Sequence, residues 1–520
     1  MIQELQLRLS PRDASNPHTI KDAAARKCGI KIKKINAIQV LRRSIDARGR
    51  NVMIQIQLVI YTDGDTPASV PPVEYPMVEN ATPIIIIGSG PAGMFAALKC
   101  IEKGYRPIVL ERGKDVRSRR VDLKSLSVDH IVNPDSNYCF GEGGAGTYSD
   151  GKLYTRSRKR GDVDGVLRRL VECGAQEEII TDARPHIGTN RLPQVVENIR
   201  HRITEHGGLY LFGERVTDFI IKDSHIEGVI TSGGEKYTAA AVILATGHSA
   251  RDIYALLHRK GIMIESKAVA LGVRAEHSQD LIDHIQYGKE GRGKYLPAAS
   301  YKIVEQCAGR GVYSFCMCPG GYIVPSATDE CQVVVNGMSP SSRNNRYANS
   351  GIVVEIHPED LPESYHKHGE LCMMEYIKDM EYRSWTAGGK SQCAPAARMT
   401  DFCEKRASSS LPTTSYTPGI TSADMDYVLG DFVAPRLREG FVKFGQKMRG
   451  YYTSEACIIG VESRTSSPVR IPRDATTLSH PQISGLFPSG EGAGYAGGIV
   501  SAAIDGENCA LAAINYISGK

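Results

Sequence analysis

The hydrophobic positions near residue 83 follow a strand–helix–strand order. Four isoleucines, Ile84–Ile87, form an apolar run that is too short for a free helix and typical of a buried parallel strand. Helix-compatible residues follow up to Lys103, and a second short strand is expected at Pro107–Leu110. Another buried apolar run, Ala240–Gly247, ends in a turn of small residues. These runs predict an α/β fold of the Rossmann type, built on a parallel sheet.

The first 62 residues have a different pattern and predict a small N-terminal α+β module. Strands are expected at Ile2–Leu9, Ala37–Ile45 and Val52–Tyr61, and a helix at Thr19–Cys28. Residues 63–82 are rich in Pro, Gly and Asp and are interpreted as a linker.

The composition changes again after about residue 263, which indicates an inserted domain of mixed α+β type. The expected elements there are four strands and two helices: Val269–Arg274, Gly311–Phe315, Gly321–Val324, Gln332–Met338, Leu361–Met380 and Ser422–Gln446. Residues 162–205 are expected to be largely helical. Leu209–Phe219 and His225–Thr231 are expected to form a small antiparallel set. The predicted domains are therefore 83–262, an insert at 263–454, and a return to the first domain at 455–520.

The glycines after the first buried strand carry the strongest chemical signal. Gly88, Gly90 and Gly93 match G-x-G-x-x-G: the first allows a tight turn, the second a close approach of a pyrophosphate, and the third close helix–strand contact. Pro91 suits a first helical position. Glu111 lies 23 positions after Gly88, near the spacing expected of a ribose-binding acid. The pattern predicts a dinucleotide site; the alternative is a glycine-rich turn without a ligand.

Two later glycine-rich stretches can contact the same ligand. Residues 137–156 include Gly141, Gly143, Gly144 and Gly146, which leave the backbone free to approach a flat or charged group. Residues 485–517 contain the turn Gly490-Glu491-Gly492 and a helix expected to start at Gly497-Gly498. A helix N-terminus favours an electron-rich ligand edge.

Overall composition excludes few functions. The chain has 520 residues with a formal charge of +5, too small for this length to indicate nucleic acid or membrane binding. We see no signal peptide and no apolar run near the ~18 residues of a membrane span. We therefore expect a cytoplasmic protein with reduced thiols and no membrane partner.

The N-terminal module has a local excess of positive charge. Between Ile20 and Arg50 the sequence contains ten basic residues but only two acidic ones, Asp22 and Asp46. This could form an RNA-binding face, but a solvated surface is favoured because no aromatic residues are interleaved for base stacking. We therefore do not expect a nucleic-acid partner.

The cysteines do not follow a familiar ligand spacing. Cys307, Cys316, Cys318 and Cys331 are spaced C-x8-C-x-C-x12-C, so we expect no metal or cluster. Cys139 has no C-x-x-C partner and is not interpreted as half of a redox disulfide.

Six blocks spread from Gly88 to Gly506 carry a family resemblance: GSGPAGMFAAL, FGEGGAGTYSDGKL, LATGHSARD, CPGGYIVPS, ESRTSSPVR and GEGAGYAGGIVSAAIDG. Together they resemble FAD-dependent oxidoreductases of the two-dinucleotide-binding-motif flavoprotein group, which have a glutathione-reductase-type FAD domain. Within that group the chain is similar to the bacterial FAD-utilising dehydrogenase family. The resemblance implies a Rossmann-like FAD/NAD(P)-binding domain with FAD as cofactor.

The resemblance also implies roles for residues of these blocks. It assigns pyrophosphate binding to the first glycine turn and ribose binding to the end of the second strand. It places the later glycines along the cofactor, an acid near the ribitol, and the last helix at the pyrimidine edge of the flavin. The implied cofactor-binding residues are Gly88, Gly90, Pro91, Ala92, Gly93, Glu111, Arg112, Gly143, Gly144, Thr246, Gly247, Gly490, Glu491, Gly498 and Ile499.

One departure from the wider group concerns the electron source. Neither a second G-x-G-x-x-G unit nor a redox cysteine pair of the disulfide-reductase kind is visible. We therefore expect no dedicated nicotinamide domain, although NAD(P)H remains open as an electron donor.

The leading functional hypothesis is an FAD-dependent oxidoreductase, a dehydrogenase, acting on a small and anionic organic substrate. Arg251 and Arg464 would orient this substrate and His248 would assist proton transfer. The alternative for both arginines is a structural ion pair. Two alternative functions stay open, an RNA-directed flavoprotein and a non-catalytic flavin-binding protein.

Overall fold

The computed structural model describes residues 2–155 and 158–519. Its centre is a five-stranded parallel sheet in the order β22-β10-β4-β5-β6. The strands are β4 (Pro83–Ile87), β5 (Arg106–Glu111), β6 (Leu209–Phe212), β10 (Val242–Leu244) and β22 (Leu486–Pro488). The predicted parallel α/β core is confirmed.

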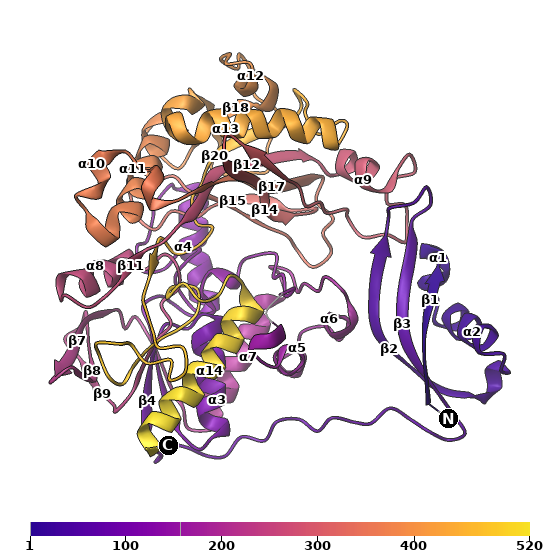
Figure 1. Cartoon of the computed structure of the whole chain (residues 1–520), viewed down its shortest axis with the longest axis horizontal. Helices are drawn as coiled ribbons and strands as arrows, with labels where there is room; N and C mark the ends of the chain where they lie inside the picture. Colours follow the sequence, from indigo (N-terminus) through magenta and orange to yellow (C-terminus); the bar gives the residue numbers. More distant parts are fainter. Residues whose placement is uncertain (1, 156–157, 520) are drawn as a thin grey trace.

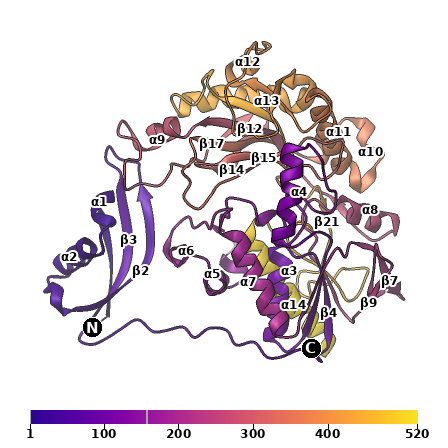
Figure 2. The ribbon, with the colours of Figure 1, turned by 180° about the vertical axis from the view of Figure 1, so that it is seen from behind.

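The isoleucine run of β4 is buried because both faces of the sheet are covered. Ile84 and Ile86 belong to one core and Ile85 and Ile87 to another, as expected for side chains that alternate along a strand. The first core lies under α3 (Pro91–Glu102), α5 (Val163–Glu172), α7 (Leu192–Glu205) and α14 (Ile499–Ser518). Figure 2 shows α3, α7 and α14 beside the sheet.

The second core lies under α8 (Arg251–Arg259) and a small antiparallel sheet of β7 (Val216–Lys222), β8 (His225–Thr231) and β9 (Lys236–Thr238). The prediction that all of Leu209–Phe219 joins an antiparallel set was wrong for its first part. Residues 209–212 form β6, which pairs in parallel with β5. The turn at Gly213 separates the two strands, and it has a left-handed backbone, φ +74°.

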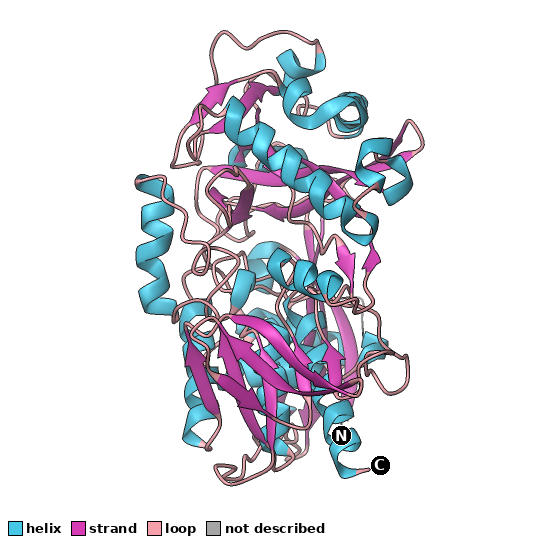
Figure 3. Cartoon of the chain, turned by 90° about the vertical axis from the view of Figure 1, so that its left-hand side faces the viewer, coloured by secondary structure: helices cyan, strands magenta, loops and turns pink. Residues whose placement is uncertain are grey.

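The inserted domain forms a second lobe around a seven-stranded sheet in the order β13-β14-β17-β12-β20-β18-β19 (Figures 1 and 3). These strands are β12 (Val269–Ser278), β13 (Val304–Cys307), β14 (Arg310–Cys318), β17 (Tyr347–Ile356), β18 (Ala394–Arg398), β19 (Ile420–Ser422) and β20 (Cys457–Glu462). A separate ribbon pairs β15 (Tyr322–Pro325) with β16 (Val335–Met338). The expected end of this domain at residue 454 is too early, because β20 pairs with the central strand β12.

Long helices cover this second sheet. They include α11 (Cys372–Ala387) and α13 (Met425–Lys447), together with the shorter α9 (Gln279–Tyr287), α10 (Glu363–His366) and α12 (Met399–Cys403). The continuous helix expected over Leu361–Met380 is interrupted after His366. Gly369 adopts a left-handed backbone there, φ +56°, which a right-handed helix cannot include.

The lobes are joined by short elements and by α4. The paired strands β11 (Glu265–Ser266) and β21 (Val469–Arg470) lie where the chain enters and leaves the insert. The helix α4 (Val116–Val128) contacts β15, and α6 (Glu178–Thr181) contacts the N-terminal module.

The N-terminal module is a three-stranded antiparallel sheet in the order β1-β3-β2, set to one side of the molecule (Figure 1). Its elements are β1 (Ile2–Leu9), α1 (Pro11–Ala14), α2 (Pro17–Cys28), β2 (Ile35–Asp46) and β3 (Met53–Thr62), which confirms the predicted strands and helix. A long irregular segment connects it to β4. Within the described residues, no helix is both long and apolar enough to cross a membrane.

Candidate functional site

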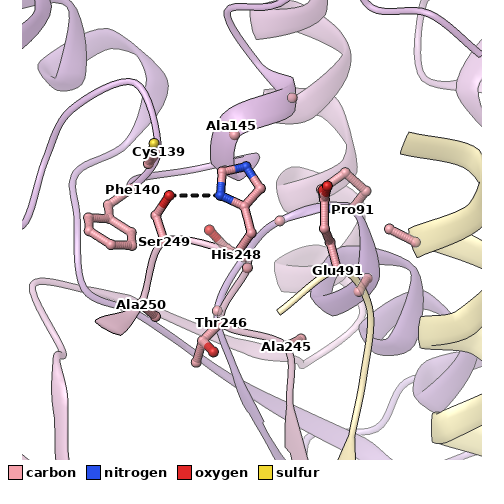
Figure 4. A pocket seen from close by; sticks show the side chains of 18 of the residues that line it. Pro91, Cys139, Phe140, Ala145, Ala245, Thr246, His248, Ser249, Ala250 and Glu491 are labelled. Atoms are coloured by element: carbon pink, nitrogen blue, oxygen red, sulfur yellow. Dashed lines mark hydrogen bonds between the residues drawn. The ribbon is translucent and has the colours of Figure 1, made fainter. Parts of the chain in front are cut away.

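A cavity of about 370 Å³ opens at the carboxyl ends of β4, β5 and β10, the edge at which open α/β sheets bind ligands. Its walls come from the parallel-sheet domain and from the inserted domain. Phe315, Cys316, Asn336 and Gly337 contribute from the insert. Figure 4 shows part of the wall.

The turn after β4 has the geometry that its glycines predict. Gly88 has φ +99°, and a Cβ there would lie 2.5 Å from the carbonyl oxygen of Ala245. A Cβ on Gly93 would lie 1.9 Å from the carbonyl oxygen of Gly88, so Gly93 allows α3 to pack against the turn. A Cβ on Gly90 would meet nothing within 4 Å. Gly90 lines the cavity at the N-terminus of α3, so its bare backbone leaves room for a ligand there.

Several other predicted cofactor residues line the same cavity: Pro91, Ala92, Glu111, Arg112, Gly144, Thr246, Gly247, Glu491, Gly498 and Ile499. They come from the ends of β5 and β10, from the start of α3, from the loop after α4, from the turn after β22 and from the start of α14. Segments hundreds of residues apart in the sequence therefore meet at one cavity, and α3 and α14 both begin at its wall.

Gly93, Gly143 and Gly490 are not among the residues that line the cavity, and they shape the surrounding turns. Gly143 has φ +78° and its N–H donates to the carbonyl oxygen of Ser89 at 2.9 Å, which ties the glycine-rich loop to the turn after β4. Gly490 donates its N–H to Asp505 Oδ2 at 2.7 Å, and a Cβ there would lie 2.8 Å from the Cβ of Ala92. The turn at Gly490 is therefore bonded to α14 through Asp505 and lies close to Ala92 at the start of α3.

The Glu111 carboxylate is held by the protein itself. One oxygen accepts hydrogen bonds from the N–H and the hydroxyl of Ser89, at 3.0 and 2.6 Å. The other accepts from the N–H groups of Gly113 and Gly141, at 2.9 and 3.0 Å. A carboxylate has about four lone-pair sites, so a ribose hydroxyl would have to share or replace one of these donors. The predicted ribose contact stays a prediction.

Arg112 is also fixed by partners. Its guanidinium contacts Asp135 at 2.8 Å and Asp252 at 3.0 Å, and it lies over the ring of Phe140, 4.2 Å from the centroid. These contacts therefore fix the Arg112 side chain in the cavity wall at the end of β5.

His248 projects into the cavity between Phe140 and Pro91 (Figure 4), and its Nδ1 lies 2.7 Å from the hydroxyl oxygen of Ser249. Burial, together with the positive charges of Arg464 and Arg251, lowers the pKa of His248 to about 3. At neutral pH the imidazole is therefore uncharged.

Arg251 and Arg464 meet at one buried carboxylate, Glu381. Arg251 donates to both oxygens of Glu381 at 2.8 Å, and Arg464 Nε donates at 3.0 Å. Burial would raise the pKa of Glu381, but the two guanidinium groups outweigh it and hold that pKa at about 2. Arg251 is not among the cavity-lining residues, whereas Arg464 is.

The structure also brings to the cavity residues that sequence reasoning did not select. Lys152 lies in the wall at the end of the glycine-rich loop, and Cys316 and Asn336 reach it from β14 and β16. Only Lys152 had a signal, because it lies within the block FGEGGAGTYSDGKL. The positions of the other two depend on how the inserted domain folds over the parallel sheet.

Among residues 2–155 and 158–519, three buried polar atoms of cavity-lining residues find no hydrogen-bond partner: Thr246 Oγ1, Ser489 Oγ and Arg464 Nη1. A buried polar group without a partner is costly, so such atoms mark places where a ligand supplies the missing bonds. Together with the open backbone at Gly90, they fit an elongated polar cofactor such as a dinucleotide. The fold and the cavity define a dinucleotide-binding protein of the α/β class.

Comparisons with protein families agree with this class. Residues 268–465 match the model "FAD-dependent protein, C-terminal domain-like", and residues 83–122 match an FAD binding domain. Residues 190–299 match the model "Glucose inhibited division protein A", and residues 1–61 match a domain of unknown function.

An uncharacterized protein of Clostridium beijerinckii is 38% identical over 509 residues, covering 94% of each chain. The chain belongs to the same family, a family of FAD-dependent proteins, and its cofactor is FAD. A more distant similarity, 26% over 167 residues, links it to the tRNA uridine 5-carboxymethylaminomethyl modification enzyme of Alkaliphilus oremlandii. That match covers 32% of this chain and 24% of the enzyme.

Solved structures resemble the fold only loosely. CtdE in complex with FAD is 14% identical with a TM-score of 0.32, and 84% of each chain is covered. A geranylgeranyl bacteriochlorophyll reductase-like protein from Thermoplasma acidophilum is 11% identical with a TM-score of 0.35, covering 84% of this chain and 80% of that one.

Proposed function

We propose that the protein is an FAD-dependent dehydrogenase that exchanges a hydride or an electron pair with a small anionic organic substrate. The substrate would bind in the part of the cavity where the inserted domain faces the parallel-sheet domain. FAD, when bound, supplies the two-electron chemistry, and the chain binds, orients and shields the reactants.

The proposal of an anionic substrate rests on one nitrogen of the Arg464 side chain, Nη1. The Nη2 of this side chain is anchored to Thr328 and Gln332 at 3.1 and 3.2 Å, and its Nε to Glu381. Nη1 is buried without a partner among the residues that the structure describes, and Arg464 lines the cavity. A fixed guanidinium with one open donor suits a carboxylate or a phosphate.

The local charge balance supports the same substrate class. Two guanidinium groups, from Arg251 and Arg464, share the single carboxylate of Glu381. One positive charge is therefore left over in a buried place, and an anion would neutralise it. Arg251 acts here as a brace that holds Glu381 and, through it, Arg464.

Two further groups can act on the reactants. His248 is neutral at neutral pH, so it can accept a proton or donate a neutral N–H hydrogen bond, but it carries no extra proton to deliver. The N-terminus of α14 at Gly498 supports negative charge on a neighbouring ring edge.

The test is anaerobic reduction of the FAD-loaded protein by NADH, NADPH and a panel of organic acids and phosphates, followed at the flavin absorbance band. Arg464→Met should keep FAD and slow reduction by the anionic substrate, largely through a higher KM. Arg406→Met, at an exposed surface ion pair, is the matched control. Wild-type kinetics for Arg464→Met, with an anionic donor that does reduce the flavin, would overturn the role of Arg464.

The RNA-directed alternative gains no separate support. The stretch that matches the glucose inhibited division protein A model, residues 190–299, lies outside the basic N-terminal module.

A further inference from the structure

Two cysteines of the inserted domain lie around one lysine at the edge of the cavity. Cys316 lines the cavity, while Cys318, two residues later, is 0% exposed. The ammonium of Lys152 lies 3.7 Å from Cys316 Sγ and 4.0 Å from Cys318 Sγ. One sulfur is thus open to the cavity and its neighbour is enclosed.

The backbone of β14 explains why the first cysteine turns towards the cavity. The pairing of β14 with β17 shifts between Phe315 and Cys318, so the strand has an extra residue there. Cys316 has a left-handed backbone, φ +43°, which is uncommon for a residue with a side chain. Such bulges redirect side chains and are frequent beside active sites.

The charges around Cys316 favour its thiolate. The neighbouring Cys318 side chain, followed by the positive charges of Lys152 and Arg274, lowers the pKa of Cys316 well below that of an ordinary thiol, against the effect of burial. Hydrogen bonding to Cys316 and burial raise the pKa of Cys318. Lys152 stays charged because Asp150 lies 3.2 Å away.

The spacing allows a bond between the two sulfurs. Both sulfurs lie within 4.0 Å of the same ammonium, and their residues are two positions apart, so a small rearrangement can bring the sulfurs to bonding distance. The Cys318 thiol already points back along the strand, donating to the carbonyl oxygen of Cys316 at 3.3 Å.

We propose that Cys316 and Cys318 form a redox-active dithiol whose substrate is a small organic disulfide, with Cys316 as the attacking sulfur and Cys318 as the resolving sulfur. The Cys316 thiolate attacks one sulfur of the disulfide R–S–S–R, forms a Cys316–S–S–R bond, and releases RS⁻, which takes a proton from water. The Cys318 thiol gives its proton to water, its sulfur displaces the second RS⁻, and the Cys316–Cys318 bond forms. The two thiols lose two electrons and the small disulfide gains them. The reaction needs no electron from the flavin, so it is independent of the function proposed above.

The test uses the purified FAD-loaded protein and bis(2-hydroxyethyl) disulfide, with peptide mass as the readout. Trypsin releases the peptide Gly311–Arg343, which contains Cys316, Cys318 and the exposed Cys331. Cys331 is therefore an internal reference thiol in the same peptide. In the wild type this peptide should lose two hydrogens, through a Cys316–Cys318 bond. Cys318→Ser should instead retain one hydroxyethylthio group on Cys316.

The variants separate an active pair from ordinary thiols. Cys316 should react with iodoacetamide at pH 7 at least ~10-fold faster than Cys331, and Lys152→Met should reduce that difference. Cys331→Ser is the matched control and should leave disulfide formation unchanged. The proposal is overturned if Cys316 reacts no faster than Cys331, or if Cys318→Ser traps no adduct at Cys316. A wild-type peptide that keeps both thiols free in excess disulfide overturns it as well.

Discussion

Replacing Glu381 with glutamine should lower the free energy of unfolding by about 3 to 5 kcal/mol, the usual cost of removing one partner from a buried ion pair. Glu381 is 0% exposed and receives hydrogen bonds from Arg251, Ser463 and Arg464. The amide keeps the shape of the side chain but leaves two buried guanidinium groups without a counter-charge. It also turns an NH₂ group towards other donors.

The pKa of Glu381 gives the same magnitude independently. Its shift from 4.5 to about 2 corresponds to about 3 kcal/mol, at ~1.4 kcal/mol per pKa unit. Because the folded-state pKa is the lower one, this stabilisation is complete above the unfolded pKa and is lost as pH falls towards the folded pKa. The stability difference between wild type and Glu381→Gln should therefore narrow by about 1 kcal/mol between pH 5 and pH 3.5.

Urea unfolding of both proteins across that pH range measures both effects. Glu439→Gln is the control: Glu439 forms a solvent-screened helical ion pair with Lys443, which should contribute little to stability. If Glu381→Gln unfolds like this control, or if its deficit stays constant with pH, the buried carboxylate does not neutralise the two arginines as described.

Three further outcomes are expected. Gly90→Val should fold but lose FAD, because its side chain fills the open space at the N-terminus of α3. The control Gly233→Val, in a surface turn, should retain FAD. The measurement is the flavin absorbance per protein chain. A chain beginning at Glu74 should keep FAD, because it loses only the N-terminal module and part of the linker and retains Val78, whose N–H donates to the carbonyl oxygen of His206. A soluble but colourless product would refute this. Burial raises the pKa of Glu491 to about 7. In the FAD-free protein, ionisation of this carboxyl group therefore lowers the free energy of unfolding as pH rises from 4.5 through 7. Glu491→Gln should therefore raise the Tm at pH 8 more than at pH 5, and an equal shift at both would contradict the argument.

The parallel core could be predicted from sequence because its signals are local. The four isoleucines of β4, the glycine turn and the start of α3 lie within one short stretch, and each is specified by its immediate neighbours. The boundary at residue 454 could not be found in this way. Strand β20 belongs to the inserted domain only because it pairs with β12, which lies far away in the sequence.

The residues of the candidate site could likewise be predicted from the sequence only where the signal was local. Glycine motifs pointed to most of the cavity wall, and Arg464 was selected from its place before the last glycine helix. The partner of both arginines was not foreseen, because Glu381 lies on α11, where the local pattern shows only a helix. The pairing of Lys152 with Cys316 likewise depends on how the two lobes meet.

The order in which the chain is made has a consequence for the parallel sheet. Strand β4 and helix α3 are synthesised early, whereas β22 and α14, which complete the same layer, come after the whole inserted domain. The contact between these helices is close: a Cβ on Gly506 of α14 would lie 2.0 Å from the carbonyl oxygen of Ala92. Until α14 emerges from the ribosome, the apolar side of α3 around Phe95 therefore stays uncovered, while the insert can already bury its own core. Nascent chains would pass through a stage in which the inserted lobe is folded and the cofactor lobe is still open.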